Sequence, residues 1–145
     1  MYRHILIPTD GSELAEHGVA QGLALAKSLG AKVTVILVEE RAGWLPFAET
    51  GAAEAFAKYT EEIKQHYTSA LDRVANMAKQ TSVPCDTIQV QNSQPYEAIV
   101  ATATDRGCDL IVMASHGHSG LAAMVLGSVT NKVLTHAKTP VLVCQ

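Results

Sequence analysis

The residues best suited to chemistry lie in one segment of small residues, 114–128, which reads ASHGHSGLAAMVLGS. An apolar run precedes this segment, and its last two residues can start a helix. Small residues let a backbone approach phosphate oxygens closely, and the free amides and dipole of a helix N-terminus favour negative charge. No Asp or Glu occurs from residue 110 to 145, so this part of the chain would not repel an anion. The pattern suits a di- or triphosphate.

The spacing of these residues excludes two kinds of phosphate-binding loop. No Lys follows a glycine as GxxxxGK[ST] requires, and the segment contains no GxGxxG fingerprint. A plainer interpretation stays open, in which the glycines only make turns and Ser128 only caps a helix. His116 and His118 could suggest a metal pair, but no acidic or cysteine side chain accompanies them. We therefore expect both histidines on a solvated loop.

Hydrophobic periodicity predicts the elements that must position this segment. Apolar, β-branched runs predict strands at 4–9, 32–38, 85–91 and 110–114, and a last strand after Pro140. Apolar residues at steps of three and four predict helices over about 12–29 and 51–80, and further helices opening at Pro95 and at Gly127–Ser128. Residues 39–50, which contain Trp44 and Phe47, lack a sustained period, so we expect a loop there.

Strict alternation of strands and helices predicts an α/β fold with a five-stranded, doubly wound parallel sheet, Rossmann-like, with helices on both faces. The chain has 145 residues, so we expect one domain spanning 1–145. In such sheets, ligands bind beyond the C-terminal ends of the strands, where connections leave for opposite faces. The expected site combines Asp10, the residues after Val38, and the segment 114–128.

The composition indicates a sizeable core without a basic surface. Hydrophobic residues make up 48% of the chain and charged residues 17%, which excludes a disordered charged tail. The net charge of -3 provides no general positive field for nucleic acid. No apolar stretch approaches the ~18 residues of a membrane span, and the N-terminus has no room for a secretory signal. The three cysteines form no CxxC pair, which fits a reducing compartment. We expect a soluble, cytoplasmic protein.

The chain resembles the universal stress protein family over its whole length. The matching motifs are PTDGS at 8–12, DLIVMASHG at 109–117, GSVTNKVL at 127–134 and TPVLVC at 139–144. The ATP-binding branch carries Gly, two residues, Gly, nine residues, then Gly followed by Ser or Thr. Gly117 and Gly127–Ser128 fit this signature, but Ala114 replaces the first glycine, and Ser93 stands where the family often has a glycine. We expect Ala114 to have a relaxed, negative φ, which tolerates the extra methyl group.

The resemblance implies a nucleotide site and its residues. Pro8, Thr9 and Asp10 would border the nucleoside, backbone groups near Val38 would meet the adenine, and Gly117, Gly127, Ser128 and Val129 would hold phosphates. Met113 and Ala114 at the end of the strand 110–114, and His116 just after it, complete the candidate set. Asp10 could instead cap the first helix, or do both. The ligand would be ATP or AMP, with Mg²⁺ or Mn²⁺ held through the phosphates.

Three functions fit these observations. The first is an adenine-nucleotide-binding regulator of the stress response, acting through nucleotide-dependent contacts with an unidentified protein partner. The second is a slow ATP hydrolase or phosphotransferase, for which Asp10 is the clearest carboxylate in the crevice. The third is a stress protein that works through protein contacts alone. In each case we expect a homodimer formed through the C-terminal strand, 140–145, whose apolar edge a second copy can pair with.

Overall fold

The computed structural model describes residues 1–40, 53–116 and 126–145. Gly117, His118, Trp44 and Phe47 therefore lie outside the described residues. The elements, in chain order, are β1 (His4–Thr9), α1 (Glu13–Leu29), β2 (Lys32–Glu39), α3 (Ala53–Thr81), β3 (Cys85–Gln91), α4 (Pro95–Asp105), β4 (Leu110–Ala114), α5 (Ser128–His136) and β5 (Val141–Cys144). Every predicted strand and helix is confirmed, with bounds that differ from the predictions by no more than a few residues.

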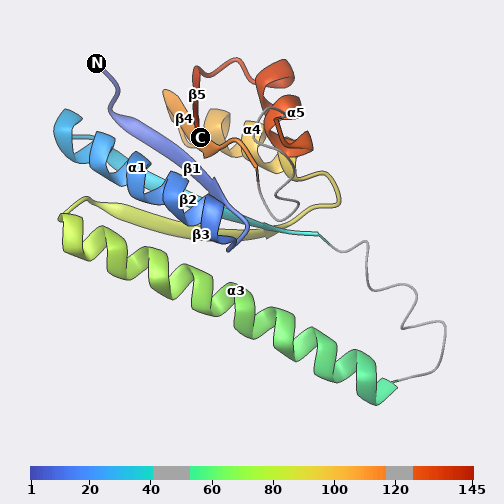
Figure 1. Ribbon diagram of the computed structural model, residues 1–145. Coiled ribbons are helices and arrows are strands. Elements are labelled where there is room, and N and C mark those ends of the chain that lie inside the picture. The colour runs from blue at the N-terminus through green and yellow to red at the C-terminus, as the bar shows by residue number, and fades with distance from the viewer. Residues whose placement is uncertain (41–52, 117–125) are drawn as a thin grey trace.

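The five strands form one parallel sheet in the order β3-β2-β1-β4-β5. Thr9 at the end of β1 pairs with Leu37 of β2, so Asp10 and Val38 follow at the same level of the sheet. The strands all end on one side of the molecule, which is the right-hand side in Figure 1. The predicted doubly wound parallel sheet is confirmed.

Helices cover both faces of the sheet, α1 and α3 one face and α4 and α5 the other (Figure 1). Successive residues of a strand point to opposite faces, so Ile5 and Ile7 of β1 belong to the core under α1 and α3. Leu6, between them, belongs to the core under α4 and α5. This double burial explains why the central strands are continuous apolar runs instead of alternating ones.

Local signals fix both ends of α1. The Ser12 hydroxyl accepts a hydrogen bond from the Ala15 amide at 3.2 Å, so Ser12 is the N-cap, and Gly30 ends the helix at a φ of 67°. Gly22 brings α1 close to the sheet, because a Cβ there would lie 2.4 Å from Cδ1 of Ile7. The helix therefore packs directly on β1 and starts where β1 ends.

The long helix α3 packs on the rest of the molecule mainly through its C-terminal half. Its buried residues are Ala70, Val74 and Ala78, and an ion pair between Arg73 and Glu16 ties it to α1. Its N-terminal half extends past the ends of the strands (Figure 1). In the parts of the chain that the structure describes, neither this helix nor any other is long and apolar enough to cross a membrane.

The connections place a crevice between β1 and β4. From β1 the chain enters α1 on one face, whereas α5, which follows β4 along the chain, covers the opposite face. Neighbouring strands whose connections diverge in this way leave an opening beyond their C-terminal ends. This opening is the position that strand and helix alternation predicts for the site.

We predict that the core under α1 depends on Leu23, which is fully buried there. Leu23→Ala should lower the free energy of unfolding by about 2 to 5 kcal/mol through lost burial and the resulting cavity. Leu14→Ala on the same helix is the control, because Leu14 is 42% exposed, and its effect should be much smaller. Urea denaturation followed by circular dichroism measures both changes, and equal losses would contradict the assigned packing.

Candidate functional site

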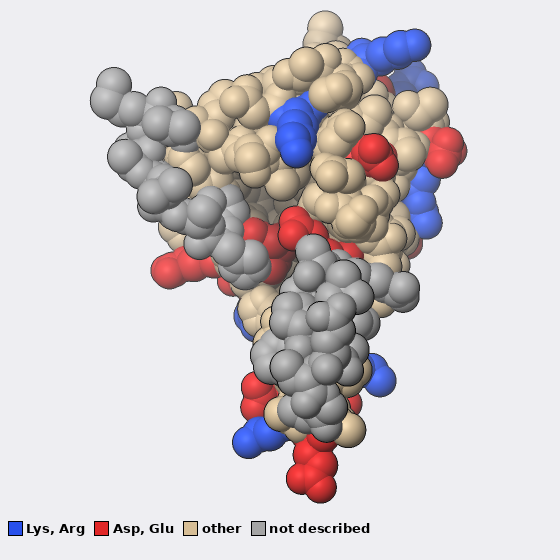
Figure 2. All heavy atoms as spheres, turned by 90° about the vertical axis from the view of Figure 1, so that its right-hand side faces the viewer, with Lys and Arg blue, Asp and Glu red and all other residues tan. Residues whose placement is uncertain are grey.

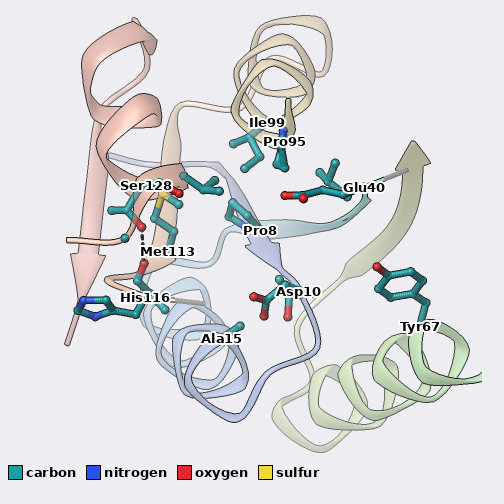
Figure 3. A pocket seen from close by; sticks show the side chains of 16 residues that line it. Pro8, Asp10, Ala15, Glu40, Tyr67, Pro95, Ile99, Met113, His116 and Ser128 are labelled. Carbon is teal, nitrogen blue, oxygen red and sulfur yellow. Dashed lines mark hydrogen bonds between the residues drawn. The ribbon is translucent and has the colours of Figure 1, made fainter. Parts of the chain in front are cut away.

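A cavity of about 360 Å³ opens where the connections diverge. Its lining comes from the ends of β1, β2 and β4 and from four helices: Pro8, Thr9, Asp10, Ala15, Val38, Glu40, Tyr67, Pro95, Ile99, Met113, Ala114, His116, Gly127, Ser128, Val129 and Thr130. Figure 3 shows Ser128 and His116 at one end of this cavity, Asp10 in the middle, and Glu40 and Tyr67 at the other end. Segments distant in sequence thus share one compact site.

All the predicted site residues that the structure describes line this cavity. They are Pro8, Thr9, Asp10, Val38, Met113, Ala114, His116, Gly127, Ser128 and Val129. Gly117, the remaining candidate, lies outside the described residues. The structure brings the candidates together, and their binding of a nucleotide stays a proposal.

The N-terminus of α5 forms the left-hand end of the cavity in Figure 3. Gly127 is the N-cap residue, without a side-chain cap, so Ser128 is the first helical residue and does not cap the helix. The amide of Gly127 donates to the Ser115 carbonyl at 2.7 Å, and the Thr130 hydroxyl donates to the Ala114 carbonyl at 2.9 Å. These two bonds fix the first turn of α5 against the end of β4. The helix presents uncapped amides there, which favour an anion.

Gly127 is favoured by limited space and not by backbone conformation. Its φ is -60°, which any residue can adopt. A Cβ at this position would lie 3.1 Å from the Ser115 carbonyl oxygen and 3.4 Å from Cα of His116. The missing side chain therefore lets α5 start directly against the backbone that follows β4.

Ala114 has the relaxed backbone expected of it. Ser82 is the only non-glycine residue with a positive φ in the parts of the chain that the structure describes. Gly18 of α1 lies beside Ala114, since a Cβ on Gly18 would be 3.2 Å from the Ala114 nitrogen and 3.5 Å from its Cβ. The absence of a side chain on Gly18 therefore lets α1 approach the backbone at the end of β4 closely, while the methyl group of Ala114 would be in ordinary van der Waals contact with a Cβ there.

The expectation of a solvated His116 is wrong. His116 is buried, with 8% of its surface exposed, and its Nδ1 lies 3.1 Å from the Ser115 hydroxyl. Its Nε2 has no hydrogen-bond partner among the described residues, and the ring points away from Asp10 (Figure 3). The sequence could not show this burial, because it depends on contacts with segments distant along the chain, such as Gly127 beside the His116 backbone. His118 lies outside the described residues.

Carboxylates occupy the middle and the opposite end of the cavity. One oxygen of Asp10 accepts a hydrogen bond from the Ser12 amide at 2.9 Å, so Asp10 supports the turn before α1 although Ser12 is the cap. Glu40 follows β2 and points its carboxylate toward the middle of the cavity (Figure 3). Burial raises the pKa of the Tyr67 hydroxyl, and the negative charges of Glu39, Glu40 and Asp10 raise it further. Tyr67 therefore stays protonated and remains a hydrogen-bond donor.

The charges of the cavity are unevenly distributed. Figure 2 views the side on which the strands end and shows acidic side chains gathered around the middle of that surface. No Lys or Arg is among the described residues that line the cavity. Within the described ranges, no group of three His, Cys, Asp or Glu side chains is arranged to hold a metal ion. Positive potential within this lining therefore comes from backbone amides at helix N-termini, that of α5 among them.

Six lining residues lie outside the set of individually predicted residues: Ala15, Glu40, Tyr67, Pro95, Ile99 and Thr130. Glu40 belongs to the residues after Val38 that the strand order places at the site, although it was not predicted individually. For Tyr67, the sequence predicted only a position on the apolar face of a helix. Its role in the cavity depends on how far α3 extends past the strands, and the sequence does not state this distance.

The fold and its cavity define a doubly wound α/β protein with a ligand crevice at the switch point of its sheet. The model of the Universal stress protein family matches residues 1–145, so the chain belongs to this family. Universal stress protein MJ0531 of Methanocaldococcus jannaschii is 34% identical over 143 residues, covering 99% of this chain and 82% of the relative. YxiE of Bacillus subtilis is 30% identical over 147 residues and covers 99% of both chains.

Solved structures share the fold. That of protein MJ0577 superposes with a TM-score of 0.80 at 28% identity, covering 99% of this chain and 95% of the other. A universal stress protein in complex with cAMP superposes with a TM-score of 0.71 at 23% sequence identity, and the match covers 99% of this chain and 97% of the other. The universal stress protein of Archaeoglobus fulgidus in complex with dAMP superposes with a TM-score of 0.70 at 17% sequence identity, and the match covers 99% of this chain and 98% of the other. Because these two structures share less than 25% of their sequence with this chain, their similarity shows only that the fold is the same.

We predict that Ala114→Gly makes the protein less stable without disturbing its fold. The φ of Ala114 is already relaxed, so glycine gains nothing in the folded state and adds conformational freedom to the unfolded chain. The free energy of unfolding should fall by about 0.5 to 1 kcal/mol. Chemical denaturation measures this change. A more stable variant would show that the methyl group of Ala114 is strained.

Proposed function

We propose that this protein binds an adenine nucleotide, ATP or AMP, in the cavity at the switch point of the sheet. The observation that carries the proposal is the uncapped N-terminus of α5, held against β4 with Gly127 and Ser128 facing the cavity. It offers an anion site of backbone amides within a family of which this chain is a member. Relatives of the same fold have been solved with cAMP and with dAMP, and these ligands are consistent with the proposal.

The ligand would lie across the ends of three neighbouring strands. Its phosphates would sit at the N-terminus of α5, Asp10 would accept from ribose hydroxyl groups, and the base would lie beyond Val38. The phosphates would carry Mg²⁺ or Mn²⁺ with them, because such ions keep several waters and need no cage of protein side chains. The absence of Lys and Arg from the described lining favours a metal-bound polyphosphate, since the metal would offset its charge.

The cavity supports binding better than catalysis. Phosphoryl transfer requires a nucleophile held in line by a base or an orienting group, close to the terminal phosphate. The carboxylates of the described lining are Asp10 and Glu40, which follow β1 and β2, whereas the proposed anion site lies at α5, beside the end of β4. We therefore propose a regulator in which nucleotide occupancy changes the contacts made with a protein partner.

The phosphate site is tested with Gly127→Asp. The new carboxylate would lie where the phosphates are proposed to bind, and loss of one hydrogen bond to a charged group alone corresponds to ten- to a hundredfold in affinity, about 1.5 to 3 kcal/mol. Titration calorimetry with ATP and AMP should show binding to the wild type and a loss of at least this size in the variant. Circular dichroism checks that the fold persists.

Two further variants separate charge from space at this site. Asn131→Asp adds the same charge on the exposed side of α5 one turn further along, and should have little effect. Gly127→Ala adds only a methyl group, which would press on the Ser115 carbonyl. Wild-type protein that binds neither nucleotide would refute the proposed function. Binding that is unchanged in Gly127→Asp would move the phosphates away from α5.

We propose that the protein is a cytoplasmic homodimer paired through β5. Cys85, Cys108 and Cys144 are free thiols, which is consistent with a reducing compartment. β5 is an edge strand of the sheet, and Leu142 on it is 46% exposed. An apolar edge with unpaired backbone groups can be covered by a second copy in antiparallel pairing.

Leu142→Lys tests this interface without removing the strand. A charge on the exposed edge should weaken dimerisation, whereas the fold should persist because the side chain is half-exposed. Light scattering at micromolar concentration should find a dimer for the wild type and a larger monomer fraction for the variant. A monomeric wild type, or a variant as dimeric as the wild type, would contradict the interface.

A further inference from the structure

Two neighbouring carboxylates at the end of β2 have different surroundings. Glu39 is buried, and its Oε2 accepts hydrogen bonds from the side-chain amides of Gln91 at 3.2 Å and Gln89 at 3.3 Å. It is engaged in holding β2 and β3 together. Glu40 is exposed, lines the cavity and directs its carboxylate toward the middle of it (Figure 3). No hydrogen bond or ion pair joins Glu40 to another of the described residues.

The order of the strands places Glu40 at the far end of the cavity from the anion site. α5 follows β4, Asp10 follows β1 and Glu40 follows β2, and these strands are adjacent in the sheet. Neighbouring strands are about 4.8 Å apart, so Glu40 lies roughly two strand spacings from β4. A nucleoside phosphate with its phosphate at α5 and its ribose over β1 would carry its base to β2 and Glu40.

A carboxylate at that position accepts hydrogen bonds and cannot donate them. The amino group of adenine donates, so it suits Glu40, whereas the oxygen at the same position of hypoxanthine would face it as a second acceptor. The field of Glu39, Glu40 and Asp10, which raises the pKa of the nearby Tyr67 hydroxyl, is likewise unfavourable to such an oxygen.

We infer that Glu40 determines base specificity, selecting a 6-aminopurine over a 6-oxopurine. This inference rests on the proposed function, which supplies the nucleotide. A site that hydrogen-bonds a ligand NH group rejects the analogue that lacks it, because its own polar group is then left unpaired. Water reaches the exposed Glu40, which weakens this penalty, so the expected preference for AMP over IMP is about tenfold and not the roughly ten thousandfold of a sealed pocket.

The test compares AMP with IMP by titration calorimetry in the wild type and in two variants. Glu40→Gln keeps the shape of the side chain and offers both an amide oxygen and an amide NH₂, so it can accept from an amino group or donate to a keto oxygen. The tenfold preference should shrink to about twofold or less, chiefly through tighter binding of IMP. Glu39→Gln is the matched control, because it removes a neighbouring charge without changing the group in the cavity, and it should keep the preference.

Each outcome bears on Glu40. Equal affinity for AMP and IMP in the wild type, or an unchanged preference in Glu40→Gln, would overturn its role and leave nucleotide binding standing. The same loss of preference in a folded Glu39→Gln would show that net charge and not the Glu40 contact sets it, which also overturns the inference. Binding of neither AMP nor IMP to the wild type would refute the nucleotide site itself. Circular dichroism verifies the fold of both variants.

Discussion

The parallel pairing of β1 with β4 is the constraint on which the site depends. Because α1 and α5 cover opposite faces of the sheet, no helix among the described residues closes the space beyond the ends of these two strands. The hydrophobic cores on the two faces of the sheet stabilise this arrangement, because Ile5 and Ile7 pack into the core on one face and Leu6 packs into the core on the other. The cavity is therefore a consequence of how the sheet is wound.

Close backbone contacts then set the shape of that cavity. The Gly127 amide meets the Ser115 carbonyl at 2.7 Å, and Gly18 lies against Ala114 from the other face. At each contact a Cβ on the glycine would lie 3.1 or 3.2 Å from a backbone atom, so there is little room for a side chain. Ala114 itself is accommodated because its φ is not positive, so its backbone conformation does not require glycine.

The charges follow the same order as the strands. Backbone amides at the N-terminus of α5 favour an anion at one end of the cavity, whereas carboxylates follow β1 and β2. The two halves of the site come from different parts of the chain. One lies in the segment free of Asp and Glu from 110 to 145, and the other lies in the first 40 residues.

The sequence by itself determined the elements and their alternation, because hydrophobic period, caps and glycines are local signals that can be read along the chain. It also located the strand-end residues of the site, since parallel strands must bring their C-terminal ends together. Only the tertiary structure decided the contacts between distant elements. Tyr67 reaches the cavity because α3 extends past the strands, and Glu39 and Glu40 differ because β3 engages only the first. The burial of His116 is a further case: packing between distant segments leaves no period in the sequence.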